Sequence, residues 1–342
     1  MIIGISARAA FKRPRTGVEE YTYQLINHLT TLKESKRHRF ILYSHKNLKW
    51  PLPMWTQFRL AVEMAVNPPD VLFIPVHVLP LIHPQNSVVT IHGLEYEYYP
   101  EMYPWSHLRY LRWSTRYALR NARQIIAVSE NTKRDLIKLY GGQPEKIKVI
   151  YHGVDVRPLA SNKIVRPSGP DDCPFILFIG RLEAKKNIQG LVKAFDFLKK
   201  KYRVPHKLIL VGPKGYGYQE FKSRDVIEKG YISQEEKSEL LKNADLFVLP
   251  SFYEGFGMPV LEAQAVGCPV VASNVSSMPE VAGQGALLIK PENIEEIAEA
   301  IYRIISNEEF RRDLIAKGNE NVKKFSWQKC AKETLRVLES KD

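Results

Sequence analysis

Short apolar runs alternate with longer amphipathic stretches along most of the chain. The runs are rich in β-branched residues, as buried strands are, and the longer stretches place their apolar residues at helical spacing. In the first half, the predicted strands are 2–6, 39–43, 70–74, 87–91, 124–128 and 146–150, and the predicted helices are 18–32, 105–121 and one capped by Ser129. Strands that alternate with helices indicate parallel βαβ units, with helices on both faces of the sheet.

The alternation stops between residues 151 and 173, where prolines and glycines replace bulky apolar residues, and this stretch predicts a linker. It then resumes with predicted strands 175–179, 207–211, 245–249 and 269–272, and with helices 187–200, 234–242, 259–266, 292–306, 308–323 and one from Ser326. We therefore predict an α/β protein with two doubly wound, Rossmann-like domains, 1–155 and 156–325. Their ligands are expected in a cleft at the carboxyl ends of the two sheets.

Composition narrows the protein class without changing this fold. The chain has 342 residues, enough for two cores, and its apolar and charged contents of 44% and 25% are typical of soluble globular proteins. No apolar run approaches the roughly 18 residues that span a bilayer. The three cysteines are far apart, which predicts neither a disulfide framework nor a metal site and fits a cytoplasmic location.

Positive charge is concentrated in the first half. The net charge is +13, and residues 1–150 hold 21 Lys and Arg against 11 Asp and Glu. A one-sided basic surface favours an anionic partner, such as a membrane face, nucleic acid or a phosphorylated substrate. Solubility alone is the alternative explanation.

The strongest chemical signal is Pro250-Ser-Phe-Tyr-Glu-Gly-Phe-Gly-Met-Pro-Val-Leu-Glu262, which joins a predicted strand to a predicted helix. A glycine loop that opens a helix presents backbone N–H groups and the positive end of the helix dipole, and both suit a phosphate. Pro259 fits the first helical turn, where an N–H would have no partner. Glu254 and Glu262 flank this predicted anion site.

Other strand ends carry residues that suit the same ligand. Arg181 and Lys186 follow the predicted strand 175–179, where a guanidinium and an ammonium can bind a diphosphate, although either cation alone would be read as part of a solvated loop. In the first half, Gly17 opens a helix and allows close approach of a ligand. His92 follows strand 87–91, a position that favours function, although an isolated histidine is more often structural.

In combination, these motifs resemble glycosyltransferase family 4, whose members are retaining enzymes of the GT-B fold. Glu254-Gly-Phe-Gly-Met-Pro-Val-Leu-Glu262 matches the E-x7-E pattern of such enzymes. The supporting motifs are Gly180-Arg181 with Lys186-Asn187, Thr16-Gly17-Val18, Ile91-His92, Val128-Ser129-Glu-Asn-Thr132 and His152-Gly-Val-Asp155. The similarity extends over nearly the whole chain.

The resemblance implies that a sugar is transferred from a nucleoside diphosphate sugar with retention at the anomeric carbon, without a cofactor or a required metal. It implies that Arg181 and Lys186 neutralise the diphosphate, that Glu262 accepts hydrogen bonds from the ribose, and that Glu254 holds the sugar. His92, Glu254, Arg181 and Lys186 are then the catalytic set. Donor binding is assigned to these last three with Gly17, Gly255, Phe256, Gly257, Met258, Val260, Leu261 and Glu262. The helix in 326–342 is expected to cross back onto the first domain.

Two positions depart from the family pattern. Gly93 follows His92 where Asp is common, and Ser6 ends the first strand where Asp is common. Both lie in the first domain, so they affect the identity of the acceptor and the role of His92 rather than the reaction class.

Four arginines recur at helical spacing within 105–121. Arg109, Arg112, Arg116 and Arg120 form one stripe on a helix that also carries Trp105. A solvated basic face is the plain interpretation. Attachment to an anionic membrane surface, which would bring the enzyme to a lipid-linked acceptor at the inner face of the cell membrane, is the sharper hypothesis.

The sequence therefore predicts a hexosyltransferase of polysaccharide or glycoconjugate synthesis. The expected donor is GDP-mannose or a UDP-hexose, and the expected acceptor is a glycan or a lipid-linked saccharide. One alternative is a GT-B enzyme that acts on a small phosphorylated sugar. Another is a nucleic-acid-binding protein, which lacks a recognisable binding module and leaves the E-x7-E loop unexplained.

Overall fold

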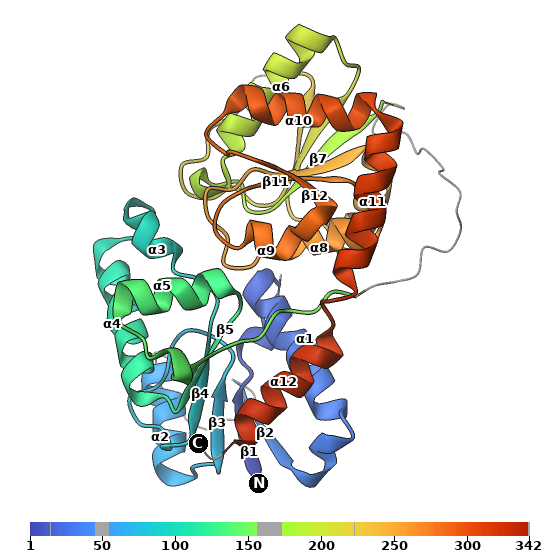
Figure 1. Ribbon diagram of the computed structural model, residues 1–342. Helices are drawn as coiled ribbons and strands as arrows, with labels where there is room; N and C mark the ends of the chain where they lie inside the picture. Colours follow the sequence, from blue (N-terminus) through green and yellow to red (C-terminus); the bar gives the residue numbers. More distant parts are fainter. Residues whose placement is uncertain (14, 45–54, 156–172, 222, 341–342) are drawn as a thin grey trace. The chain divides into compact units, whose positions relative to one another are not determined.

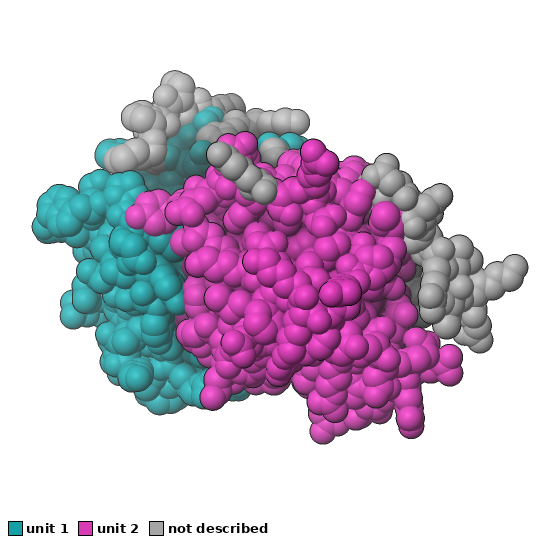
Figure 2. Space-filling view, turned by 90° about the horizontal axis from the view of Figure 1, so that it is seen from above, with its two compact units in different colours: residues 1–153, 325–342 teal, residues 154–324 magenta. Residues whose placement is uncertain are grey.

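The chain forms two compact units. The computed structural model describes residues 1–13, 15–44, 55–155, 173–221 and 223–340. Unit 1 comprises Met1–Gly153 and Phe325–Asp342, and unit 2 comprises Val154–Lys324 (Figure 2). These divisions lie within two residues of the predicted limits 1–155, 156–325 and 326–342. Most of the predicted linker, residues 156–172, lies outside the described residues.

Unit 1 is built on a parallel six-stranded sheet with the order β2-β1-β3-β4-β5-β6 (Figure 1). Its strands are β1 (Ile2–Ser6), β2 (Arg39–Tyr43), β3 (Val71–Ile74), β4 (Ser87–Ile91), β5 (Gln124–Ala127) and β6 (Ile147–Val149). Its helices are α1 (Gly17–Thr31), α2 (Ala61–Val66), α3 (Glu95–Tyr98), α4 (Trp105–Asn121), α5 (Glu130–Tyr140) and α12 (Trp327–Glu339).

Helices cover both faces of this sheet, and the inner strands β1, β3, β4 and β5 are almost entirely buried between them (Figure 1). Apolar side chains of α2, α4 and α5 join those of β3, β4 and β5 in one core cluster. α12 packs against α1 in the same unit. A side chain at Gly153 would overlap the backbone of Trp327, so this glycine allows the return of the chain at α12.

Unit 2 contains a second parallel six-stranded sheet, in the order β12-β11-β10-β7-β8-β9. Its strands are β7 (Phe175–Ile179), β8 (Lys207–Val211), β9 (Val226–Lys229), β10 (Leu246–Leu249), β11 (Val270–Ser273) and β12 (Ala286–Ile289). Its helices are α6 (Ile188–Tyr202), α7 (Gln234–Asn243), α8 (Met258–Ala265), α9 (Met278–Ala282), α10 (Ile294–Ser306) and α11 (Glu308–Val322). α6 packs against α10, and α11 packs against α8.

The predicted fold class is confirmed: both sheets are parallel, and strands and helices alternate. The pattern did not predict α2, α3, α9 or β12. The three helices among them have only four to six residues, so a helical period is hard to recognise in them.

Candidate functional site

The strand order of unit 2 places the predicted site residues at one edge of the sheet. β7 lies beside β10, and from this pair the chain winds outward in opposite directions, to β8 on one side and to β11 on the other. Ligands of doubly wound sheets bind at the carboxyl ends of the strands at such a switch point. Arg181 and Lys186 follow β7, and Glu254 follows β10. The topology therefore brings together two motifs that lie about 70 residues apart in sequence.

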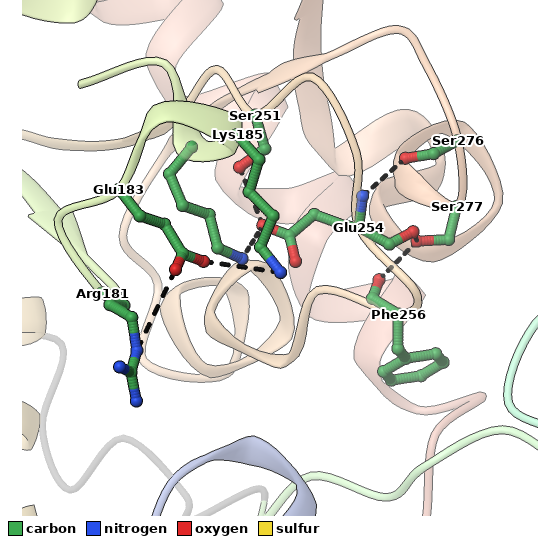
Figure 3. Close-up of polar contacts among 9 residues, drawn as sticks. Arg181, Glu183, Lys185, Ser251, Glu254, Phe256, Ser276 and Ser277 are labelled. Atoms are coloured by element: carbon green, nitrogen blue, oxygen red, sulfur yellow. Dashed lines mark hydrogen bonds and ion pairs between the residues drawn. The ribbon is translucent and has the colours of Figure 1, made fainter. Parts of the chain in front are cut away.

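Lys186 and Glu254 form an ion pair at this edge. The side chains are 17% and 10% exposed, so both charges are largely removed from solvent. Ser251 is fully buried, and its Oγ donates a hydrogen bond of 2.7 Å to Oε1 of Glu254, the oxygen that Lys186 contacts. Figure 3 shows this carboxylate with its partners. The pair presents a cation and an acceptor group side by side.

The backbone of the Glu254 loop is held by two serines from the segment between β11 and α9 (Figure 3). The N–H of Glu254 donates to Oγ of Ser276 at 2.9 Å. Oγ of Ser277 donates to the carbonyls of Glu254 and Phe256, at 2.9 and 3.0 Å. The loop is therefore fixed through its main chain as well as through the Glu254 carboxylate.

α8 begins at the end of this loop and directs its N-terminus toward the same edge. Gly257 is the N-cap, with φ of 95°, and a Cβ there would overlap the terminal methyl of Met278. Only glycine accepts this conformation without strain. The first N–H groups of a helix have no partner within the helix, and they favour an anion. Val260 and Leu261 are fully buried, so their side chains support α8 and are not available to a ligand.

The other two charged residues of the predicted site, Glu262 and Arg181, differ in how exposed their side chains are. Glu262, in the first turns of α8, pairs with Lys237 of α7 at 2.6 Å. Arg181 is 52% exposed, and its Nε lies 4.0 Å from Oε2 of Glu183 (Figure 3). Such an exposed guanidinium can turn toward a phosphate at low cost, since this contact is long.

In unit 1, His92 lies among other rings just beyond β4. Its backbone N–H donates to Nε2 of His77 at 2.6 Å, and its own Nε2 lies 2.8 Å from the carbonyl of Pro75. A carbonyl only accepts, so Nε2 carries the hydrogen and Nδ1 is left as an acceptor. The rings of Tyr21 and His152 are 4.7 and 5.6 Å away. Burial lowers the pKa of His92 to about 3, so the ring is neutral near pH 7.

Gly17 is the first residue of α1 and is exposed. A Cβ at this position would meet nothing within 4 Å. Thr16 caps the helix in a reciprocal arrangement with Glu19, so the N-terminus is well formed. No contact among the described residues requires glycine here, and approach of a ligand stays the prediction.

The arginines of α4 separate into two groups. Arg109, Arg116 and Arg120 are exposed, and the guanidinium of Arg109 lies 4.6 Å from the ring centre of Trp105. Arg112 departs from the predicted surface stripe because its guanidinium makes two hydrogen bonds of 3.0 and 2.9 Å to one oxygen of Glu97. Arg112 therefore has a structural role, and the other three remain available to an anionic partner.

Family models match both halves of the chain. Residues 161–321 match "Glycosyl transferases group 1", and residues 32–157 match "Glycosyltransferase Family 4". The O-antigen chain mannosyltransferase B of Escherichia coli is 31% identical over 275 residues, which cover 74% of this chain and 70% of that protein. The chain belongs to the group 1 glycosyltransferases.

Solved structures share the fold of this glycosyltransferase. WaaG, a glycosyltransferase of lipopolysaccharide biosynthesis, aligns with a TM-score of 0.74 at 14% identity, over 99% of this chain and all of that one. Alr3699/HepE of Anabaena, in complex with UDP and glucose, aligns with a TM-score of 0.69 at 18% identity, over 99% of both chains. The predicted GT-B fold is therefore confirmed.

Sequence reasoning missed four residues of the candidate site. Ser251, Ser276 and Ser277 hold the Glu254 loop, and Lys237 pairs with Glu262. Serine and lysine are common in loops and on helix surfaces, and no spacing marks Ser276, Ser277 or Lys237. Ser251 alone has a spacing that could have been noticed, because it stands three residues before Glu254, where a serine hydroxyl can form a local hydrogen bond.

Proposed function

We propose that this glycosyltransferase transfers a hexose with retention, and without a metal, from a nucleoside diphosphate sugar to a glycan or lipid-linked acceptor. The observation that carries the proposal is the Lys186–Glu254 pair, which lies at the switch point of unit 2, with Glu254 in the loop that leads into α8. It supplies a cation for the diphosphate and a carboxylate for sugar hydroxyls at one edge of the sheet.

Fixed positive charge is what the leaving group requires. The diphosphate gains negative charge as the glycosidic bond breaks, and preorganised cations and N–H groups stabilise that charge. Lys186, the exposed Arg181 and the N-terminus of α8 meet this requirement with side chains and backbone of unit 2. The same groups allow the reaction to proceed without a divalent cation.

When the donor binds, the Lys186–Glu254 ion pair is replaced by a contact of Lys186 with a phosphate and a contact of Glu254 with the sugar. A phosphate competes with Glu254 for Lys186, and it releases the carboxylate to accept from sugar hydroxyls. Glu262 accepts from the ribose through the oxygen that Lys237 does not hold. The pairs with Lys186 and Lys237 hold both carboxylates in place until the donor arrives.

The proposed chemistry is a front-face displacement. The bond from the anomeric carbon to the β-phosphate oxygen breaks, and its electron pair remains on that oxygen. The acceptor oxygen bonds to the anomeric carbon on the same face, and its proton passes to the leaving phosphate. His92 is neutral and offers Nδ1 as an acceptor, so its proposed role is to bind a sugar hydroxyl rather than a phosphate.

The proposed donor is GDP-mannose, with a UDP-hexose as the alternative. Mannose is suggested by the name of the Escherichia coli relative, an O-antigen chain mannosyltransferase. UDP is suggested by the Anabaena structure, which is described in complex with UDP and glucose. The first relative also suggests that the acceptor is a growing polysaccharide.

A panel of nucleotide sugars tests the proposal. The true donor should raise the melting temperature in proportion to its occupancy, whereas the other nucleotide sugars should shift it less. Incubation of that donor with lipid-linked or glycan acceptors in EDTA should give a product whose anomeric configuration, read by NMR, matches that of the donor. An inverted product, or activity restored only by a divalent cation, would contradict the respective part of the proposal.

We also propose that unit 1 operates on an anionic membrane surface. α4 exposes Trp105, Tyr110 and Trp113 beside Arg109 and contains no acidic residue. Aromatic rings favour the interfacial region of a bilayer, and arginines favour anionic headgroups. No helix among the described residues is long and apolar enough to cross a membrane.

The apolar part of this surface extends to the loop after β3. Leu81 and Ile82 are both about half exposed, and the carbonyl of Leu81 accepts a hydrogen bond of 3.0 Å from the hydroxyl of Tyr117. The rings of Tyr117 and Trp113 stack at 5.3 Å. These contacts join the loop to α4 in one apolar surface with arginines beside it.

Vesicle flotation distinguishes membrane attachment from a solvated basic face. The wild type should float with anionic vesicles at low salt and not with neutral ones. Arg109→Glu should weaken flotation several-fold, whereas Arg224→Glu, an equal charge change at an exposed arginine of unit 2, should not. Equal flotation with both vesicle types, or equal effects of the two variants, would contradict the proposal.

A further inference from the structure

Two serines of the segment between β11 and α9, Ser276 and Ser277, form hydrogen bonds with the main chain of Glu254. Ser276 accepts the N–H of Glu254, and Ser277 donates to its carbonyl, both at 2.9 Å. Ser277 is fully buried, and its hydroxyl also reaches the carbonyl of Phe256 at 3.0 Å. Figure 3 shows both hydroxyls turned toward the Glu254 loop. The N–H and the carbonyl of Glu254 are thus both fixed by side chains from another strand connection.

The conformation of Ser276 is costly for a residue with a side chain. Its φ is 54°, in the left-handed region, which it shares with only two other non-glycine residues in the described part of the chain, Asn187 and Arg203. Glycine would occupy this region without the steric penalty. Strain of this kind persists where the surrounding structure or the function requires it. The hydroxyl of Ser276 is what glycine would lack.

A purely structural explanation accounts for Ser277 more easily than for Ser276. Buried carbonyls need a donor, and Ser277 supplies one to two of them. The N–H that Ser276 receives belongs to the buried Glu254, but Ser276 itself is partly exposed, so a water molecule in place of its hydroxyl could accept this N–H. Water would not fix the position of the Glu254 backbone, whereas a strained side chain does.

We propose that Ser276 and Ser277 are positioning residues for sugar transfer. They hold the backbone of Glu254 and Phe256 so that the Glu254 carboxylate and the N-terminus of α8 contact the donor together. The inference rests on the proposed function of the Glu254 site. It assigns to the β11–α9 segment a part in donor binding through Glu254, not through contact with the donor.

Ser276→Gly separates positioning from stability. Glycine relieves the left-handed strain, so the melting temperature should stay equal or rise. Loss of the hydroxyl should raise KM for the donor and reduce kcat/KM about tenfold, because the Glu254 loop is less well preorganised. If Ser276 had only a structural role, its replacement by glycine would not lower kcat/KM while the melting temperature stays equal or rises.

Ser277→Ala and Ser273→Ala form a matched pair. Both serines are fully buried, Ser273 at the end of β11 and Ser277 just before α9, but the hydroxyl of Ser273 has no hydrogen-bond partner among the described residues. Ser277→Ala should lower kcat/KM at least tenfold, since two carbonyls lose their donor. Ser273→Ala should leave KM and kcat unchanged.

The outcomes separate this inference from the function on which it rests. A wild-type enzyme that neither binds a nucleotide sugar nor transfers a sugar overturns the proposed function and the inference with it. An active wild type with unchanged kcat/KM in Ser276→Gly and Ser277→Ala overturns the inference alone. A fall in activity of Ser276→Gly that is matched by an equal loss of thermal stability also overturns it.

Discussion

Lys186 and Glu254 illustrate how a binding site can be kept ready without its ligand. Each side chain is largely buried, and each satisfies the charge of the other. Removal of one partner leaves the other charge buried without compensation, which costs more than the pair itself contributes. The same side chains are therefore expected to matter for both stability and activity.

Lys186→Ala should lower kcat/KM for sugar transfer at least a hundredfold, because a fixed cation on the leaving diphosphate is lost. It should also lower the free energy of unfolding by about 1–3 kcal/mol, since Glu254 loses its counter-charge. Lys185→Ala is the control: it removes the same charge from the next residue, which pairs with Glu183 at 3.4 Å. Steady-state kinetics and urea unfolding measure the two effects, and equal kinetics for both variants would contradict the assignment.

The sequence pointed to Arg181, Lys186, Glu254 and Glu262 because they stand at predicted strand ends or at a helix start, where charged side chains can meet a ligand. It did not reveal that Lys186 and Glu254 pair with each other. That contact depends on β7 lying beside β10, and strand order is not encoded in local periodicity.

At the scale of elements, the start of α8 depends on one glycine. A Gly257→Ala variant places a Cβ at a φ of 95° and against Met278, which is fully buried. It should lower the free energy of unfolding by about 1–3 kcal/mol. The double variant Gly257→Ala/Met278→Ala tests the cause of this loss of stability, because it removes the overlap with the Met278 side chain but keeps the backbone strain at residue 257.

Gly17→Ala provides the contrasting case at the start of α1. A Cβ there meets nothing, so unfolding by urea should be unchanged or slightly harder, as alanine favours a helix more than glycine. A fall in kcat/KM without a loss of stability would support the predicted approach of Gly17 to the donor phosphates. Unchanged kinetics would instead mark Gly17 as dispensable.

Helices were predictable when they were long. β7, β8 and α4 begin and end where the apolar pattern places them, because each presents a full strand run or several helical turns. α9 was missed because five residues barely exceed one helical turn, whereas β12 was missed although it is as long as the predicted β10 and β11. α9 matters for the site all the same, since the segment before it carries Ser276 and Ser277.

At the scale of the whole molecule, the histidines are distributed unevenly between the units. His77, His92 and His152 lie together in unit 1, with ring centres of His92 5.7 and 5.6 Å from the other two. Burial lowers the pKa of all three, that of His92 to about 3. The unit 2 range of the sequence contains a single histidine, His206. Acid should therefore affect unit 1 first.

The direction in which pH changes the stability of unit 1 follows from proton binding in the folded and unfolded states. Each of these pKa values is lower when folded than the ordinary 6.5, so the unfolded chain binds more protons below that pH. The stability of unit 1 is complete above pH 6.5 and is lost as the pH falls toward the folded values. For His92 the loss between pH 8 and pH 5 is about 2 kcal/mol.

Tryptophan fluorescence isolates this effect because all five tryptophans fall within the sequence ranges of unit 1. The urea midpoint from fluorescence should decrease between pH 8 and pH 5, and the decrease should be smaller in His92→Gln, which cannot titrate. The midpoint is preferable to the intensity, since emission also depends on the groups beside each tryptophan, such as the ring of His28 that stacks 6.3 Å from Trp327. An identical shift in wild type and variant would show that His92 is not buried as a neutral ring, and its proposed role as an acceptor toward the sugar would fail with it.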